Sequence, residues 1–346
     1  MTDRVRWGVL GVAAIATKKV IPAMQQAGSC EIVAIASRNA ERAAHAAGQL
    51  GIARHYDSYQ ALLDDDEIDA VYIPLPNNLH AEWTIRAAKA GKHVLCEKPL
   101  AMNAAEAATV VIACEQAGVL LMEAFMYRLH PQWVAARELV AAGRIGELRS
   151  INAVFTYHNV DPANIRNVAE YGGGALMDIG CYPINVARMM FGAEPTQVHA
   201  AIRRDPTFGT DVLTSAVLDF DGRQATFVCS TQLESDQRVD LLGTEGRLTI
   251  EIPFNIPPDR PTRLIHVAGG NPPVAPGTEV IEVPATDQYR VQGELFSAAV
   301  RGEAELPTPP ADAIANMAVI DQIFTAAAAP RRDRNLLLPG QEPAIG

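Results

Sequence analysis

The chain has 346 residues, of which 49% are hydrophobic and 20% charged, so it is long enough for two domains with a sizeable core in each. Its formal net charge of -11 argues against nucleic acid and against an anionic membrane surface as partners. No run approaches the roughly 18 apolar residues that a membrane-spanning helix needs. Strand-like sequence begins at Val5, which leaves no room for an export signal, and we therefore expect a cytoplasmic protein.

The first third of the chain alternates short apolar runs with amphipathic helical stretches. This βαβ rhythm predicts an α/β fold with a doubly wound parallel sheet of the Rossmann type. Buried strands are expected at 5–10, 31–36, 70–73, 93–96 and 119–122, and helices near 16–27, 40–49, 81–90 and 104–117.

The pattern changes after Glu123, so we place one domain at 1–124 and a second, α+β domain at 125–346. A helix near 132–142, a strand at 147–159 and a helix near 175–191 come first. Half-buried antiparallel strands are then expected at 197–203, 211–219, 225–233, 238–242 and 247–251, with hairpin turns at Asp221-Gly222 and Glu245-Gly246. The stretch 255–277 is expected to be irregular, helices to follow near 289–301 and 310–328, and the tail 330–346 to be mostly loop.

The five cysteines and eight histidines predict no metal site, because neither residue type shows the spacing of metal ligands. Cys96 and Cys181 fall beside the motifs described below. We interpret both as small packing residues, since no histidine lies in an activating local motif. Reduced thiols are expected throughout.

A possible cofactor site follows the first strand, in the pattern Gly11-x-Ala13-x-x-Ala16. A dinucleotide fingerprint has glycine at the first two positions, and alanine is still small enough for close backbone approach and helix–strand packing. An ordinary strand–helix turn would show the same pattern. The candidates for cofactor binding here are Gly11, Ala13, Ala14, Ile15 and Ala16.

The end of the second strand bears on which dinucleotide is bound. An NAD site normally places an acidic residue there, whereas this chain has Ser37 and Arg38, with Arg42 one helical turn further on. A hydroxyl and guanidinium groups suit a 2′-phosphate, so we expect NADP(H) to be preferred over NAD(H). The alternative is that Arg38 is a solvated loop residue.

A proline-bracketed loop follows the third expected strand, at the sheet edge where a cofactor's ribose and nicotinamide would lie. His80 could contact the ligand there or cap the following helix. The candidates in this loop are Pro74, Leu75, Pro76, Asn77 and His80.

Two further motifs carry candidate chemistry. Glu97-Lys98-Pro99 follows a buried strand, where an ammonium near low-dielectric surroundings suits proton transfer, although a surface lysine at a loop start is the alternative. Three glycines at 172–174 precede a helix on which Asp178 and Tyr182 share a face, with Asn185 three residues beyond. A helix with a chance polar stripe is the alternative there.

Taken together, these motifs resemble the glucose–fructose oxidoreductase / inositol dehydrogenase / MocA family. The resemblance rests on residues 11–16, Pro76-Asn77 with His80, Glu97-Lys98-Pro99, and the triple glycine with Asp178. It implies a Rossmann domain followed by a substrate-binding domain built on a large, mostly antiparallel sheet. The open face of that sheet would make a homodimer or homotetramer, and the helix at 310–328 could pack back on the first domain.

The resemblance also implies roles for individual residues. Lys98 matches the catalytic lysine and Asp178 the acid that orients substrate, while Tyr182 is similar to the branch with xylose dehydrogenase and dihydrodiol dehydrogenase. Further substrate candidates are Tyr157 and Asn159, with Arg166 and Asn185 as weaker ones. Met126 and Arg128 would line the nicotinamide pocket, together with Glu97 and Lys98.

The reaction implied is reversible hydride transfer between nicotinamide and a sugar or polyol carbon, with oxidation of an aldose C1 to its lactone as first choice. The base would be Tyr182, as a phenolate stabilised by Lys98, or Lys98 itself, because a nearby positive charge lowers the pKa of a phenol. Two rival interpretations are a non-catalytic sugar or nucleotide sensor on the same scaffold and a nucleotide-dependent glycosidase.

Overall fold

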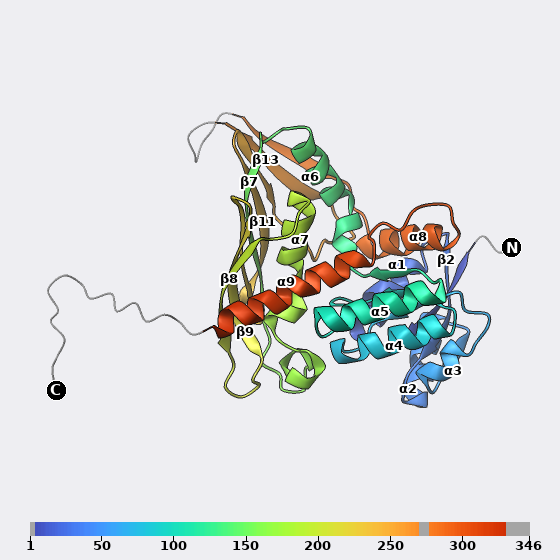
Figure 1. Ribbon diagram of the computed structural model, residues 1–346. Helices are drawn as coiled ribbons and strands as arrows, with labels where there is room; N and C mark the ends of the chain where they lie inside the picture. Colours follow the sequence, from blue (N-terminus) through green and yellow to red (C-terminus); the bar gives the residue numbers. More distant parts are fainter. Residues whose placement is uncertain (1–3, 270–276, 330–346) are drawn as a thin grey trace, which may run out of the picture.

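A computed structural model describes residues 4–269 and 277–329. The chain forms two sheets with helices between and around them (Figure 1). This arrangement confirms the predicted α/β class with an N-terminal Rossmann sheet and a large, mostly antiparallel second sheet. No helix within the two described ranges is long and apolar enough to cross a membrane.

The first sheet has six parallel strands in the order β3-β2-β1-β4-β5-β6. Successive strands are added on one side of β1 up to β3 and on the other side from β4 onward, as in a dinucleotide-binding sheet. Its strands are β1 (Val5–Leu10), β2 (Cys30–Ala36), β3 (Arg54–Tyr56), β4 (Ala70–Ile73), β5 (His93–Cys96) and β6 (Leu121–Glu123). The connecting helices are η1 (Ala16–Val20), α1 (Ile21–Met24), α2 (Ala40–Leu50), α3 (Tyr59–Leu63), α4 (Asn77–Lys89) and α5 (Ala104–Ala117).

The second sheet has eight strands in the order β14-β13-β12-β11-β7-β10-β9-β8, all antiparallel except the central β7–β10 pair. They are β7 (Leu148–His158), β8 (Gln197–Arg204), β9 (Asp211–Phe220), β10 (Arg223–Ser230), β11 (Gln232–Gly243), β12 (Gly246–Ile250), β13 (Thr262–Ala268) and β14 (Thr278–Val283). Asp221 and Gly222 turn β9 into β10 with positive φ angles, as a tight hairpin requires.

Helices cover one face of this second sheet and join it to the first (Figure 1). The short helices η2 (Met126–Leu129), η3 (Ile165–Asn167) and η4 (Ala169–Tyr171) connect longer elements, and η5 (Leu176–Gly180) continues directly into α7 (Cys181–Phe191). The remaining helices are α6 (Pro131–Ala141), α8 (Gln288–Val300) and α9 (Ala311–Ala328). The last two pack back on the first sheet's helices: α8 contacts α1, and α9 contacts α5, where Asp321 accepts a hydrogen bond from the Ala104 N–H at 2.9 Å.

Several expectations from the sequence need correction. The short β3 and α3 were not anticipated, because three partly buried residues are too few to show a periodic pattern. The stretch 255–277 is not wholly irregular, since Thr262–Ala268 alternates inward and outward along β13, and β14 follows it. The helix expected at 16–27 is a π-helical turn followed by one α-helical turn. The tail expected at 330–346 and residues 270–276 lie outside the described part.

Candidate active site

A cavity of about 470 Å³ lies between the carboxyl ends of the first sheet's strands and the helices on the second sheet. Its lining residues come from the loops of the first sheet and from the segments that pack on the second sheet. A cavity at the carboxyl edge of a parallel sheet, between two parts of a molecule, is a common place for a cofactor and a substrate to meet. The lining residues are Ala13, Ala14, Ile15, Lys19, Pro74, Leu75, Asn77, His80, Glu97, Lys98, Met126, Phe155, Tyr157, Asn159, Ile165, Arg166, Tyr171, Gly172, Gly173, Asp178, Ile179, Tyr182, Asn255 and Tyr289.

The turn after β1 has the geometry that a dinucleotide needs. Gly11 has a φ of +124°, and a Cβ there would lie 3.1 Å from the Leu75 side chain, so the position favours glycine. Ala13, Ala14 and Ile15 follow and line the cavity, while Gly11 and Ala16 are buried behind them. Small side chains at this turn leave the backbone open to the cavity, which fits a cofactor's phosphates.

The residues expected to choose between the two dinucleotides lie at the end of β2, outside the cavity lining. Ser37 is buried and its hydroxyl accepts the Asn39 N–H at 3.2 Å. Arg38 and Arg42 are exposed, and neither forms an ion pair with a carboxylate in the described ranges. Arg38 also interacts with the side chain of Tyr59, so both guanidinium groups lie beside β2 without a carboxylate partner in the described ranges.

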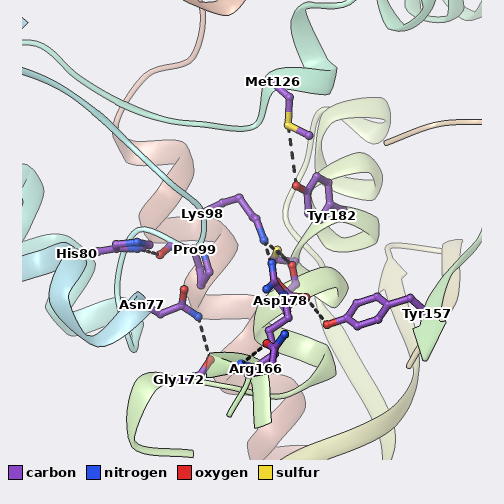
Figure 2. Close-up of polar contacts among 12 residues, drawn as sticks. Asn77, His80, Lys98, Pro99, Met126, Tyr157, Arg166, Gly172, Asp178 and Tyr182 are labelled. Carbon is purple, nitrogen blue, oxygen red and sulfur yellow. Dashed lines mark hydrogen bonds and ion pairs between the residues drawn. The ribbon is translucent and has the colours of Figure 1, made fainter. Parts of the chain in front are cut away.

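His80 lines the cavity, as one of the two alternatives from the sequence requires, and it does not cap the following helix. Both ring nitrogens are already engaged, each 2.7 Å from a carbonyl oxygen, one of Pro99 and one of Leu75 (Figure 2). The helix that contains it, α4, begins at Asn77 after Pro76 and has no side-chain cap. His80 thus ties the loop after β4 to the loop after β5. Pro74, Leu75 and Asn77 line the cavity, whereas Pro76 does not.

Lys98 extends from the end of β5 into the cavity and contacts the other half of the molecule (Figure 2). Its Nζ donates to the backbone oxygen of Asp178 at 2.7 Å and lies 3.3 Å from the Asp178 Oδ1. Burial lowers the pKa of Lys98, but the nearby acidic groups, Asp178 first and then Cys181 and Glu97, together outweigh burial and the pKa is raised. Behind this loop, the Glu123 carboxylate accepts the Leu100 N–H at 2.8 Å and holds the chain in place.

Asp178 gathers three side chains around one carboxylate. Its Oδ2 accepts hydrogen bonds from the Tyr157 hydroxyl at 2.6 Å and from the Arg166 Nε at 2.8 Å, while Oδ1 faces Lys98. Burial would raise the pKa of Asp178, yet Lys98 and Arg166 together lower it to about 2. Asp178 is therefore an ionised clamp that fixes the geometry of the cavity wall.

Tyr182 lies in the same cavity as Lys98, but its hydroxyl forms no hydrogen bond with that ammonium. The Lys98 Nζ lies over the face of the ring, 5.2 Å from its centroid, and the Tyr182 hydroxyl points to the Met126 sulfur at 3.9 Å. The ring packs edge-to-face against Phe125 and Phe155. Burial raises the pKa of Tyr182 well above its ordinary value, which favours the neutral phenol.

The helix that carries Asp178 and Tyr182 is anchored by an acid that no sequence motif indicated. Asp211, at the start of β9, is buried and accepts the Leu176 N–H at 2.7 Å, in the manner of a helix cap. Gly174 has a φ of +117°, and a Cβ there would collide with the Asp211 carboxylate. The last glycine of the triplet is therefore required where the helix meets β9.

Asn185 and Arg128 also lie outside the cavity. Asn185 is fully buried: its Oδ1 accepts the Tyr127 hydroxyl at 2.6 Å, and its Nδ2 donates to Asp312 on α9 at 3.1 Å. Arg128 pairs with the same Asp312 at 2.5 Å. The expected substrate role of Asn185 and cofactor role of Arg128 are thus wrong, because both serve a buried network between α7 and α9.

The other candidates from the sequence are brought together. Met126, Glu97, Tyr157, Asn159 and Arg166 all line the cavity with Lys98 and Asp178. Sequence reasoning missed further lining residues, because none of them forms a recognisable chemical pattern with its neighbours: Lys19, Phe155, Ile165, Tyr171, Ile179, Asn255 and Tyr289.

Comparison with known proteins identifies the family. Residues 5–125 match the model of the oxidoreductase family with an NAD-binding Rossmann fold, and residues 133–249 match that of the GFO/IDH/MocA C-terminal domain. The chain belongs to the GFO/IDH/MocA oxidoreductases. The resemblance predicted from the sequence is thus confirmed, as is the assignment as an oxidoreductase enzyme.

Individual relatives cover nearly the whole of this oxidoreductase. It is 49% identical to an uncharacterized oxidoreductase of Rhizobium meliloti, over 94% of this chain and 97% of the relative. It is 42% identical to D-xylose 1-dehydrogenase (NADP(+)) 2 of Haloferax volcanii, over 93% of this chain and 97% of the relative. A 3-ketoreductase of Actinomadura kijaniata, solved in complex with NADP and TDP-benzene, superposes with a TM-score of 0.87 at 34% identity, over 93% and 98% of the two chains.

Proposed function

We propose that this enzyme transfers a hydride between NADP(H) and a hydroxyl-bearing carbon of a sugar or related polyol. The observation that carries the proposal is the Lys98 ammonium, clamped by Asp178 in a cavity at the carboxyl edge of the Rossmann sheet. The nicotinamide supplies or accepts the hydride when it is bound. The chain itself supplies the proton and the substrate contacts.

Lys98 is the residue we assign to proton transfer, in place of the Tyr182–Lys98 pair. Its ammonium can donate a proton to a substrate oxygen during carbonyl reduction, and the neutral amine that results can take the proton of the hydroxyl during alcohol oxidation. Asp178, Tyr157 and Arg166 hold this ammonium and the surrounding wall in place. Tyr182 contributes an aromatic face beneath Lys98 and closes the cavity against the core.

The preference for NADP(H) is supported by the end of β2. Arg38 and Arg42 are exposed there, and Ser37-Arg38 occupies the place where an NAD site would have an acid. The named relatives agree with this choice, since one is a NADP(+) dehydrogenase and another was solved with NADP. We favour an aldose oxidised at C1 to its lactone as the substrate, on the strength of the xylose dehydrogenase relative.

We also propose that the two sheets mark two domains, 1–124 for the cofactor and 125–346 for substrate and assembly. Helices cover only one face of the second sheet in the described part (Figure 1). The other face carries Val154, Val217 and Val228, all half-buried, around a shallow hollow across β7 to β11. Such a face suits contact with a second copy of the chain, as a homodimer or homotetramer.

A spectrophotometric screen of aldoses, inositols and diols with NADP+ and with NAD+ tests the proposal. We expect turnover with sugars, and a lower KM for NADP+ than for NAD+. Lys98→Met should remove most turnover, about 100-fold or more, while NADPH still binds. Nucleotide binding without turnover of any compound would support a sensor, and near-normal turnover of Lys98→Met would refute the assigned proton donor.

A further inference from the structure

Arg166 presents a guanidinium group to the cavity that is only partly used. Its Nε donates to the Asp178 Oδ2 at 2.8 Å, and no other side-chain hydrogen bond of Arg166 is formed within the described ranges. The side chain is 43% exposed, and it lines the cavity beside Asp178 (Figure 2). The two Nη groups are therefore free to bind a ligand, in the fork geometry that matches a carboxylate or phosphate.

The cavity residues beside Arg166 offer hydrogen-bond donors that a ligand could use, but few such acceptors. The Asp178 carboxylate already accepts from three side chains. The Asn159 Oδ1 accepts from the Asp161 N–H at 3.0 Å and from the Asn167 amide at 3.3 Å, which leaves the Asn159 Nδ2 to donate. A sugar hydroxyl both donates and accepts, whereas an anionic oxygen only accepts, so this wall suits the anion better.

The charged side chains of the cavity also favour an anionic ligand, although the formal net charge of the whole chain is -11. Its basic lining side chains are Lys19, Lys98 and Arg166, and its acidic ones are Glu97 and Asp178. The Glu97 Oε1 is taken by the Tyr72 hydroxyl at 2.6 Å, and burial raises the pKa of Glu97. The cavity lining therefore has more basic than acidic side chains, which favours an anionic ligand.

The position of the anion follows from the contacts that Asp178 makes with Arg166 and Lys98. Arg166 and Lys98 contact opposite oxygens of the single Asp178 carboxylate, at 2.8 Å and 3.3 Å. A group bound by the Arg166 fork would thus lie only a few bonds from the carbon that exchanges hydride near Lys98. We propose that the substrate is an anionic sugar, with a carboxylate or phosphate on the reacting ring bound by Arg166 and Asn159; this inference rests on the proposed function above.

A matched series of sugars tests the inference. D-Xylose, D-glucose, D-glucuronate and D-glucose 6-phosphate share one ring and differ only in the C5 substituent. We expect the wild-type enzyme to show a kcat/KM with NADP+ at least about tenfold higher for one of the two anionic sugars than for either neutral one. Which anionic sugar is preferred identifies the group as a carboxylate or a phosphate.

Variants assign the preference to Arg166. In Arg166→Met, the ratio of kcat/KM for the anionic to the neutral sugar should fall about tenfold or more, and Arg166→Lys should retain part of it. Arg149→Met is the matched control, because Arg149 is an exposed arginine on the far end of β7, paired with Glu147, and should keep the wild-type ratio.

The outcomes separate the two proposals. A wild-type enzyme that prefers D-xylose or D-glucose over both anionic sugars, or a ratio that Arg166→Met leaves unchanged, overturns the anionic substrate and leaves the sugar oxidoreductase standing. Absence of turnover with every sugar, in the presence of normal NADP(H) binding, overturns the proposed function itself.

Discussion

At the scale of single residues, one carboxylate governs the chemistry of this site. Asp178 accepts hydrogen bonds from Tyr157 and Arg166 and pairs with Lys98, and it makes the largest contribution among the groups that favour the charged lysine. Burial lowers the pKa of Lys98, whereas Asp178, together with Cys181 and Glu97, raises it above its ordinary value. The ammonium form therefore persists at neutral pH, which favours carbonyl reduction and makes alcohol oxidation rise with pH.

Asp178→Asn should move this pH dependence in a direction that a merely structural defect would not. Removing the carboxylate removes the largest influence that raises the pKa of Lys98, so the rise of kcat/KM for sugar oxidation with pH should shift by about 1 pH unit or more toward lower pH. The maximal rate should also fall, by about 10- to 100-fold, as the clamp is lost.

Tyr157→Phe is the control for that shift, because it removes one hydrogen bond to Asp178 but keeps the charge. In Tyr157→Phe, the rise of kcat/KM with pH should stay close to that of the wild type. A rise that does not move in Asp178→Asn would mean that Lys98 is not the titrating group in turnover.

At the scale of elements, the position of the catalytic helix depends on a strand that is distant in sequence. The η5–α7 helix carries Asp178 and Tyr182, and its first turn is held by the Asp211 carboxylate of β9 through the Leu176 N–H. The close approach of Gly174 to Asp211 makes this contact possible. A disturbance at this junction should therefore reach the cavity as well as the stability of the fold.

Gly174→Ala should be more destabilising than Gly192→Ala, although both glycines have a positive φ. Gly192 ends α7 with a φ of +60°, and nothing lies within 4 Å of the place that an added methyl group would take, so the left-handed conformation alone should cost about 1–2 kcal/mol. Gly174, at +117°, adds the collision with Asp211 and should cost about 1–3 kcal/mol more. Urea unfolding measures both, and equal destabilisation by the two changes would contradict the close fit.

At the scale of the whole molecule, the open face of the second sheet is the surface available for assembly. Along β9, Ala216 and Leu218 point inward and are buried, while Ser215 and Val217 alternate with them on the opposite face. A half-buried apolar residue at the centre of an uncovered sheet is well placed to pack against a second copy.

Val217→Arg should convert the expected dimer or tetramer to monomers, since a charge would be desolvated at the centre of the contact. Sedimentation equilibrium at several protein concentrations measures the change. Ile112→Arg is the control, because Ile112 is 51% exposed on α5, away from that sheet, and its variant should keep the wild-type mass. A monomeric wild-type protein would overturn the proposed assembly.

The sequence alone determined the Rossmann half almost strand by strand, because buried parallel strands and their helices leave a strong local pattern, as at Val5–Leu10 and Ala104–Ala117. It also located Lys98, Asp178 and Tyr182 through their motifs. Only the tertiary structure decided which of these side chains meet: Tyr182 turns its hydroxyl to Met126 and Asn185 turns to α9, whereas Arg166 reaches Asp178. The reason is that helix spacing fixes a residue's face, but its partners come from β7, β9 and α9, whose approach is set by packing far along the chain.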